Sequence, residues 1–176
     1  VGLLIAYLAT RLPGTSVAVV DALPARRGIV EQFGATFAVA DENCAGTIGD
    51  DADVVFHTSA SGAGLASAIA ACGFEATLVE LSWYGDRDIK VNLGGAFHAR
   101  RLRLISSQVG HVANSRRARW SHSRRLQSAA ALLDDDVLDQ LVAKTIAFDD
   151  LAQGMAGILG GKSDGLAPII AYPAAI

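Results

Sequence analysis

The chain has 176 residues, of which 51% are hydrophobic, only 6% are aromatic and 18 are glycine, and its formal net charge is −3. This length allows one full core, or one domain and part of another, and no apolar run approaches the roughly 20 residues of a membrane span. Cys44 and Cys72 are isolated in the sequence, which excludes a Cys-rich zinc motif and is typical of a reduced protein. We therefore expect a cytoplasmic α/β protein.

The first 21 residues, VGLLIAYLATRLPGTSVAVVD, predict a helix followed by a buried strand. An apolar segment begins at Gly2, and the β-branched run Ser16–Val20 ends on Asp21. This is the pattern of the second and third elements of a dinucleotide-binding βαβ unit, in which the acid accepts hydrogen bonds from a ribose. Gly2 would then be the third glycine of the phosphate-binding turn, and the unit's first strand would precede Val1. An ordinary αβ unit whose strand ends on an acid shares this pattern.

Alternating helical and strand patterns continue to residue 81. We expect helices at Ala25–Phe33 and Ala63–Cys72, and strands at Thr36–Ala40, Asp53–His57 and Ala76–Leu81. Strands and helices that alternate with short loops predict a parallel sheet with helices on both faces. Ligands bind outside the carboxyl ends of such strands. The candidate site therefore comprises Asp21, the pair Thr58-Ser59 and the loop after Leu81.

The pattern is less regular beyond residue 82. The elements expected there are an apolar alternation at Ile89–Leu93, a helix at Gly94–Arg100, a strand at Leu102–Ser107, a helix capped by Ser121 or Ser123 and ending near Leu133, a helix at Val137–Ala143, a strand at Thr145–Phe148, a helix at Leu151–Leu159 capped by Asp149 or Asp150, and a strand at Pro168–Tyr172. Gly160-Gly161 is expected to end the last of these helices. We predict two parts, residues 1–115 and residues 116–176.

Basic residues are concentrated in one segment. Eight arginines and no acid lie between Arg100 and Arg125, whereas the remainder carries seven basic and eighteen acidic residues. Such a segment meets a phosphate or another anion, or forms a solvated face or a subunit contact. His122, beside these arginines and near Trp120, is a candidate for docking an anionic substrate group. The other histidines are interpreted as structural or surface residues: His57, His98 and His111.

Taken in order, four stretches resemble the zinc-type alcohol dehydrogenases of the medium-chain dehydrogenase/reductase superfamily. They are VGLLIAYLA, VAVVD-ALPAR, DADVVFHTSASGAGLASAIAACGFEATLVEL and FDDLAQGMAGILGGKSDGLAPIIAY. The resemblance implies a Rossmann-like doubly wound parallel sheet that lacks its first strand. It also implies an NAD-binding domain over residues 1–115 and, over residues 116–176, a segment that returns to a catalytic domain absent from this chain.

The resemblance also implies roles for particular residues. Asp21 and Arg26 would hold the adenosine ribose or phosphate, and the charge of Asp21 would favour NAD over NADP. Thr58 and Ser59 would line the cleft beneath the nicotinamide ribose. Glu80 departs from the small residue that the family usually has at its position. Backbone groups that would bracket the nicotinamide carboxamide belong to Val79, Leu81, Ile105 and Ser107.

The function implied is hydride transfer between nicotinamide and an alcohol or carbonyl substrate, with zinc held by the absent domain. We expect no catalytic residue and no metal ligand in this chain, weak or no activity of the chain alone, and association as a dimer. Two other classes remain open. One is an S-adenosylmethionine-binding fold, which also ends its second strand on a ribose-binding acid. The other is an anion- or nucleic-acid-binding module that uses the Arg100–Arg125 segment, although the net negative charge disfavours nucleic acid.

Overall fold

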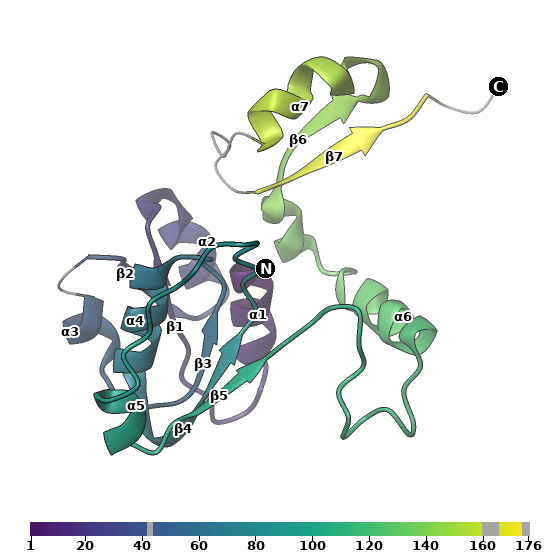
Figure 1. Ribbon diagram of the computed structural model, residues 1–176. Helices are drawn as coiled ribbons and strands as arrows, with labels where there is room; N and C mark the ends of the chain where they lie inside the picture. The colour runs from purple at the N-terminus through teal and green to yellow at the C-terminus, as the bar shows by residue number, and fades with distance from the viewer. Residues whose placement is uncertain (42–43, 160–165, 174–176) are drawn as a thin grey trace. The chain divides into compact units, whose positions relative to one another are not determined.

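The computed structural model describes residues 1–41, 44–159 and 166–173 (Figure 1). The chain divides into two compact units, Val1–Val109 and Gly110–Ile176. Each unit is built around parallel strands. Among the described residues, no helix combines the length and the apolar character needed to cross a membrane.

The first unit begins with a parallel two-stranded ladder and its helices. These elements are α1 (Gly2–Ala9), β1 (Ala18–Asp21), the 3₁₀ turn η1 (Pro24–Arg26), α2 (Arg27–Gln32), β2 (Thr36–Val39) and α3 (Cys44–Ile48). Pro24 starts η1, where its fixed φ suits a helical turn and its missing N–H costs nothing. Gly34 follows α2 with φ +84°, the left-handed conformation that ends many helices, as the sequence predicted.

The rest of the first unit is a three-stranded parallel sheet in the order β3-β4-β5. Its elements are β3 (Ala52–His57), α4 (Gly62–Ala71), β4 (Cys72–Glu80), α5 (Ala96–Ala99) and β5 (Arg103–Ser106). Ser61 caps α4, because its hydroxyl accepts a hydrogen bond from the Gly64 N–H. β4 starts four residues earlier than the predicted Ala76, so Gly73 lies inside the strand. A Cβ at Gly73 would lie 2.4 Å from Asp51 Oδ1, which explains the glycine there.

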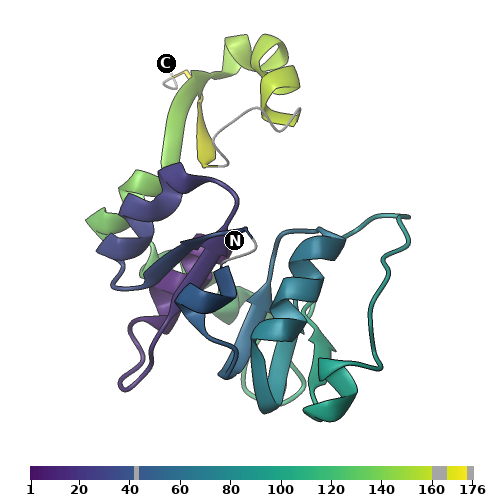
Figure 2. The same ribbon diagram turned by 90° about the vertical axis from the view of Figure 1, so that its left-hand side faces the viewer.

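The core of this sheet lies against α4. Leu65 and Ile69, one helical turn apart, pack with Leu78 of the central strand, which is 1% exposed. Figures 1 and 2 show α4 along one face of the strands and α1 on the other side of β3. Ile89 and Val91, from the apolar alternation at Ile89–Leu93, pack at the edge of this core and lie outside any strand. Their apolar alternation therefore reflects packing onto a helix rather than strand pairing.

The β1-β2 ladder and the β3-β4-β5 sheet share no strand pairing in the described part of the chain. The described strands of this unit therefore form two separate parallel ladders. Side chains bridge this break, because α1 packs against both α2 and β3. The parallel α/β architecture confirms the predicted fold class.

The second unit contains α6 (His122–Leu132), the 3₁₀ turn η2 (Asp136–Leu141), β6 (Val142–Ala147), the 3₁₀ turn η3 (Phe148–Asp150), α7 (Leu151–Leu159) and β7 (Ala167–Ala171). β6 and β7 pair in parallel. Ser121, rather than Ser123, caps α6 by accepting a hydrogen bond from the Arg124 N–H. Asp149 and Asp150, predicted as caps of α7, lie in η3 just before that helix. The Gly160-Gly161 stop lies outside the described residues.

The helix predicted at Val137–Ala143 is wrong. Its first half is the 3₁₀ turn η2, which Asp135 caps by accepting from the Val137 N–H. Its end belongs to β6, in which Val142 pairs with Ala167 of β7. The β-branched residues of this stretch favour a strand once a partner strand is available, and the partner comes from 25 residues further along the chain.

Candidate functional site

Asp21 lies at the carboxyl end of β1 and already has two partners. Its Oδ1 accepts a hydrogen bond from the Leu23 N–H at 2.9 Å, and its Oδ2 forms an ion pair with the guanidinium of Arg26. The two charged side chains are 17% and 23% exposed, respectively. The structure therefore brings together the two residues that the resemblance assigned to the adenosine side of a cofactor.

Gly2 lies beside the loop that follows β3. A Cβ at Gly2 would lie 3.0 Å from Thr58 Oγ1, closer than side chains normally approach. The first turn of α1 can approach this loop because residue 2 has no side chain. Two predicted site residues from different parts of the chain thus meet at the carboxyl end of the sheet.

The four residues expected to bracket a carboxamide lie on β4, on β5 and just beyond them. Val79 and Ile105 are register partners. The Leu81 N–H donates to the His57 carbonyl at 3.0 Å, and the Ser107 N–H donates to the Glu80 carbonyl at 2.8 Å. These two N–H groups extend the sheet and so do not donate to a ligand in this conformation.

A polar cluster that the sequence analysis did not identify occupies the carboxyl ends of β3 and β4. His57 is 4% exposed. Its Nδ1 lies 2.8 Å from Glu80 Oε2, and its Nε2 lies 2.7 Å from Ser59 Oγ. Tyr84 donates its hydroxyl proton to Glu80 Oε2 at 3.0 Å, and the Ser82 N–H donates to Glu80 Oε1 at 2.7 Å. We call these five residues the His57 cluster.

Electrostatics favour the charged form of Glu80 in this cluster. Burial raises the pKa of its carboxyl group, but hydrogen bonds from the Ser82 N–H and from the side chains of His57, Ser82 and Tyr84 outweigh burial and leave the pKa below its ordinary value. Burial, together with the hydrogen bond and the negative charge of Glu80, raises the pKa of Tyr84. Tyr84 therefore stays protonated and donates to a carboxylate.

The backbone at Gly64 and Ala60 allows the first turn of α4 and the loop after β3 to pack closely around this cluster. A Cβ at Gly64 would lie 2.2 Å from Ser59 Oγ and 3.0 Å from His57 Nε2, so the first turn of α4 packs directly on the Ser–His pair. Ala60 has φ +50°, an uncommon left-handed conformation for a residue with a Cβ. Its N–H donates to Ser82 Oγ at 3.0 Å, which holds this turn against the loop after β4.

One signal in the sequence could have revealed the cluster. His57 and Glu80 are the last residues of neighbouring parallel strands, and they are register partners. Partners in a ladder point to the same face of a sheet. The register of the two strands was not known from the sequence. The resembling family usually has a small residue where this chain has Glu80, so the resemblance did not suggest an acidic partner for His57.

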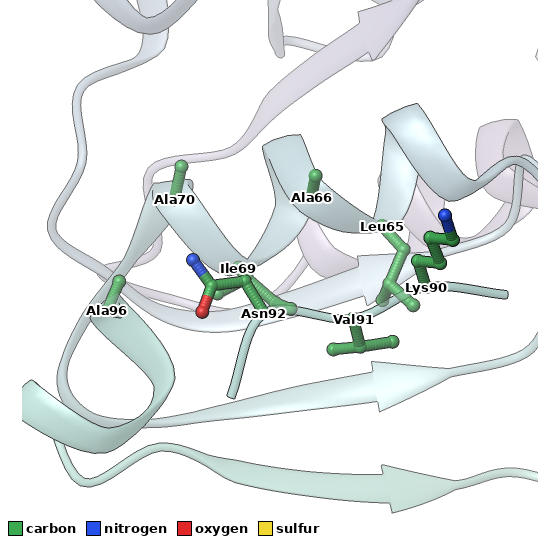
Figure 3. Close-up of a pocket in the computed structure, with 8 residues that line it drawn as sticks. All are labelled: Leu65, Ala66, Ile69, Ala70, Lys90, Val91, Asn92 and Ala96. Atoms are coloured by element: carbon green, nitrogen blue, oxygen red, sulfur yellow. The ribbon is translucent and has the colours of Figure 1, made fainter. Parts of the chain in front are cut away.

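An apolar hollow lies elsewhere in the first unit. A cavity of about 210 Å³ lies between α4, residues 90–92 and α5 (Figure 3). A more polar hollow of about 350 Å³ lies at the carboxyl end of β2, and Arg27, Phe37 and Asp41 are among its lining residues. Neither hollow is lined by a predicted site residue.

The Arg100–Arg125 segment is divided between the two units. Arg100 is a structural residue: it donates to the carbonyls of Asp50, Ala70 and Cys72 and pairs with the Asp50 carboxylate at 2.8 Å. In the second unit, Arg124 stacks over the Trp120 ring at 4.6 Å.

Comparison with known protein families identifies the family of this chain. The family model described as zinc-binding dehydrogenase matches residues 1–127. The chain therefore belongs to the zinc-binding dehydrogenase family, which confirms the resemblance stated above and disfavours the S-adenosylmethionine alternative. A search of curated proteins finds no match.

Solved structures share the fold. The Bacillus subtilis protein yhfP with NAD bound is 17% identical with a TM-score of 0.66, over 96% of this chain and 50% of that one. Galactitol-1-phosphate dehydrogenase from Escherichia coli is 18% identical with a TM-score of 0.71, over 93% and 48%. For 2R,3R-butanediol dehydrogenase from Bacillus subtilis the values are 18%, 0.69, 96% and 47%. The chain spans about half the length of these proteins.

Proposed function

We propose that this chain binds NAD(H) and forms the cofactor-binding part of a dehydrogenase that transfers a hydride between nicotinamide and an alcohol or carbonyl substrate. The observation that carries the proposal is the position of Asp21, at the carboxyl end of β1 in a member of this family. Ligands of open parallel sheets bind at this edge. The proposed site also includes Arg26, the Gly2–Thr58 contact and the carboxyl ends of β4 and β5.

The partners of Asp21 fit a ribose ligand. A carboxylate offers about four acceptor positions, and the Leu23 N–H and the Arg26 guanidinium occupy two of them. The remaining positions can accept the hydroxyl protons of an adenosine ribose. A 2′-phosphate would instead meet a negative charge, so we expect NAD to bind better than NADP.

Bare backbone at Gly2 supports the same assignment. The first N–H groups of a helix attract phosphate groups, and α1 begins at Gly2 with no side chain to shield them. Thr58, Ser59, Val79, Leu81, Ile105 and Ser107 are the candidates for the nicotinamide side. When bound, the nicotinamide ring accepts or donates the hydride, and the role of this chain is to hold and orient it.

The family description also implies zinc. No group of three or more His, Cys, Asp or Glu side chains in the described part of the chain could hold a metal ion, so we derive no zinc chemistry from it. Zinc ligands supplied by another part of a whole enzyme remain part of the proposal. So does association as a dimer, for which the exposed strand β5, with Ile105 49% exposed, is a suitable edge.

A fluorescence titration with NADH tests the proposal. The purified chain should quench or enhance NADH emission saturably, and Asp21→Ala should weaken binding by about 10-fold or more, because a charged hydrogen-bond acceptor is lost. Asp53→Ala is the matched control, since Asp53 is an exposed acid near the amino end of β3. NADPH should bind more weakly than NADH to the unmodified chain and lose this disadvantage with Asp21→Ala.

Circular dichroism of each variant shows whether it is folded. A folded chain that does not bind NADH, or an Asp21→Ala variant that binds it as well as the Asp53→Ala control, would contradict the proposal.

A further inference from the structure

Ser59, His57 and Glu80 are arranged as a nucleophile, a base and an orienting acid. Ser59 Oγ and His57 Nε2 are 2.7 Å apart, and His57 Nδ1 and Glu80 Oε2 are 2.8 Å apart. The two bonds use the two different nitrogens of one imidazole ring. Such a constellation is recognised by its geometry and not by its order in the sequence.

Glu80 determines which nitrogen of the neutral His57 ring carries the proton. Its carboxylate occupies the Nδ1 side of the ring, so the neutral ring carries its proton on Nδ1 and presents a lone pair at Nε2. Tyr84 and the Ser82 N–H hold the carboxylate in turn. The ring is 4% exposed and cannot turn without losing these bonds.

The surroundings of Ser59 suit a reactive hydroxyl. The residue itself is exposed, while its Oγ lies against Gly64 in the first turn of α4. The N–H groups of a first helical turn have no partners within the helix, and α4 begins three residues after Ser59, at Gly62. The left-handed turn at Ala60, an uncommon conformation for a residue with a Cβ, directly follows the serine.

We propose that Ser59 is an activated nucleophile that accepts acyl groups from activated carboxylic esters, with His57 as its general base and Glu80 as a positioning residue. Ser59 is also a candidate for the nicotinamide side of the cofactor site, but no step of this activity uses the dinucleotide, and the inference does not rest on the proposed function. The other polar members of the cluster, Ser82 and Tyr84, act through Glu80.

The reaction balances as an ordinary acyl transfer. Ser59 Oγ bonds to the ester carbonyl carbon while its proton passes to His57 Nε2, and Glu80 stabilises the imidazolium. The carbon–oxygen bond to the leaving alcohol then breaks, and His57 returns the proton to that alcohol. Water repeats the sequence on the acyl-serine, giving a carboxylic acid and free Ser59.

The test uses the full chain without cofactor. A fluorophosphonate probe, which replaces its fluoride with a serine oxygen, should label one site, and mass spectrometry of the chymotryptic peptide of residues 57–65 should place the label on Ser59. Ser61, two residues away, is an internal comparison, because its hydroxyl caps α4 and has no imidazole partner. p-Nitrophenyl acetate should release nitrophenolate in a burst of about one equivalent per chain.

Variants separate nucleophile, base and positioning residue. Ser59→Ala should abolish labelling, and Ser67→Ala, at an exposed position of α4, should leave it unchanged. His57→Gln should slow labelling by at least about 100-fold, because the base is lost. Glu80→Gln, whose amide oxygen can still accept from Nδ1, should slow it by about 10-fold.

Three results would overturn the assignment. They are an unlabelled wild-type chain, a label on Ser61 equal to that on Ser59, and a folded His57→Gln variant that is labelled at the wild-type rate. If His57→Gln does not fold, the rate with Glu80→Gln decides in the same way. Since no step uses NADH, failure here leaves the titration with NADH unaffected.

Discussion

Two carboxylates at the carboxyl ends of the strands, Asp21 of β1 and Glu80 of β4, are buried to a similar extent but differ in their hydrogen-bond partners. Their side chains are 17% and 15% exposed. Asp21 has one guanidinium and one N–H as partners, which leaves acceptor positions for a ligand. Glu80 accepts from His57, Tyr84 and the Ser82 N–H, so its acceptor positions are filled from within the fold. We infer that Asp21 is suited to binding a ligand, and Glu80 to holding its neighbours in place.

Removal of Glu80 should have the larger effect on stability. Glu80→Ala leaves His57 Nδ1 and the Tyr84 hydroxyl without their acceptor in a mostly buried site, and we expect the free energy of unfolding in urea to fall by about 3 kcal/mol. Glu31→Ala is the control, because the exposed Glu31–Arg27 pair should contribute less than about 0.5 kcal/mol. Equal losses for the two variants would show that the His57 cluster does not stabilise the fold.

The same carboxylate predicts a pH dependence. The pKa of Glu80 is lower in the folded chain than its ordinary value of 4.5, so its contribution is fully present above pH 4.5 and disappears as the pH falls through the folded pKa. The stability difference between wild type and Glu80→Gln should therefore be largest near neutral pH and shrink below about pH 4. Urea unfolding at pH 7 and at pH 3.5 measures it, and a difference that grows in acid would contradict the sign.

Much of the fold could be predicted from local patterns, and so could the Asp21 side of the site. The run that ends on Asp21, Pro24 at the start of a helical turn and Gly34 after a helix each act through neighbouring residues, so one sequence suffices. The His57 cluster depends on the register of two strands, and the end of the predicted helix Val137–Ala143 depends on pairing with β7. Such long-range pairings are not encoded in any local stretch of sequence.

A pair of glycines tests packing in the two halves of the first unit. Gly64→Ala would force a Cβ to within 2.2 Å of Ser59 Oγ and should destabilise the chain by about 1–2 kcal/mol, despite the higher helix propensity of alanine. Gly28→Ala in α2 meets no atom within 4 Å and should raise stability by up to about 1 kcal/mol. Thermal unfolding of both variants gives the comparison. Stabilisation by both substitutions would mean that the contact between α4 and Ser59 is loose.

Asp21→Ala should affect stability much less than Glu80→Ala. Asp21 has fewer hydrogen-bond partners than Glu80, so its loss should lower the free energy of unfolding in urea by about 1 kcal/mol or less. The same variant should lose most of its affinity for NADH. We therefore expect Asp21 to matter mainly for binding and Glu80 mainly for stability. A loss of stability at Asp21 as large as that at Glu80 would remove the distinction between the two acids.

The break between the two ladders has a consequence for cooperativity. Backbone hydrogen bonds hold β1 to β2 and β3 to β4, but no ladder joins these pairs among the described strands. α1 contacts both α2 and β3, so packing on this helix links the two halves. A cavity made under α1 would therefore weaken the link between the two halves and let them open independently.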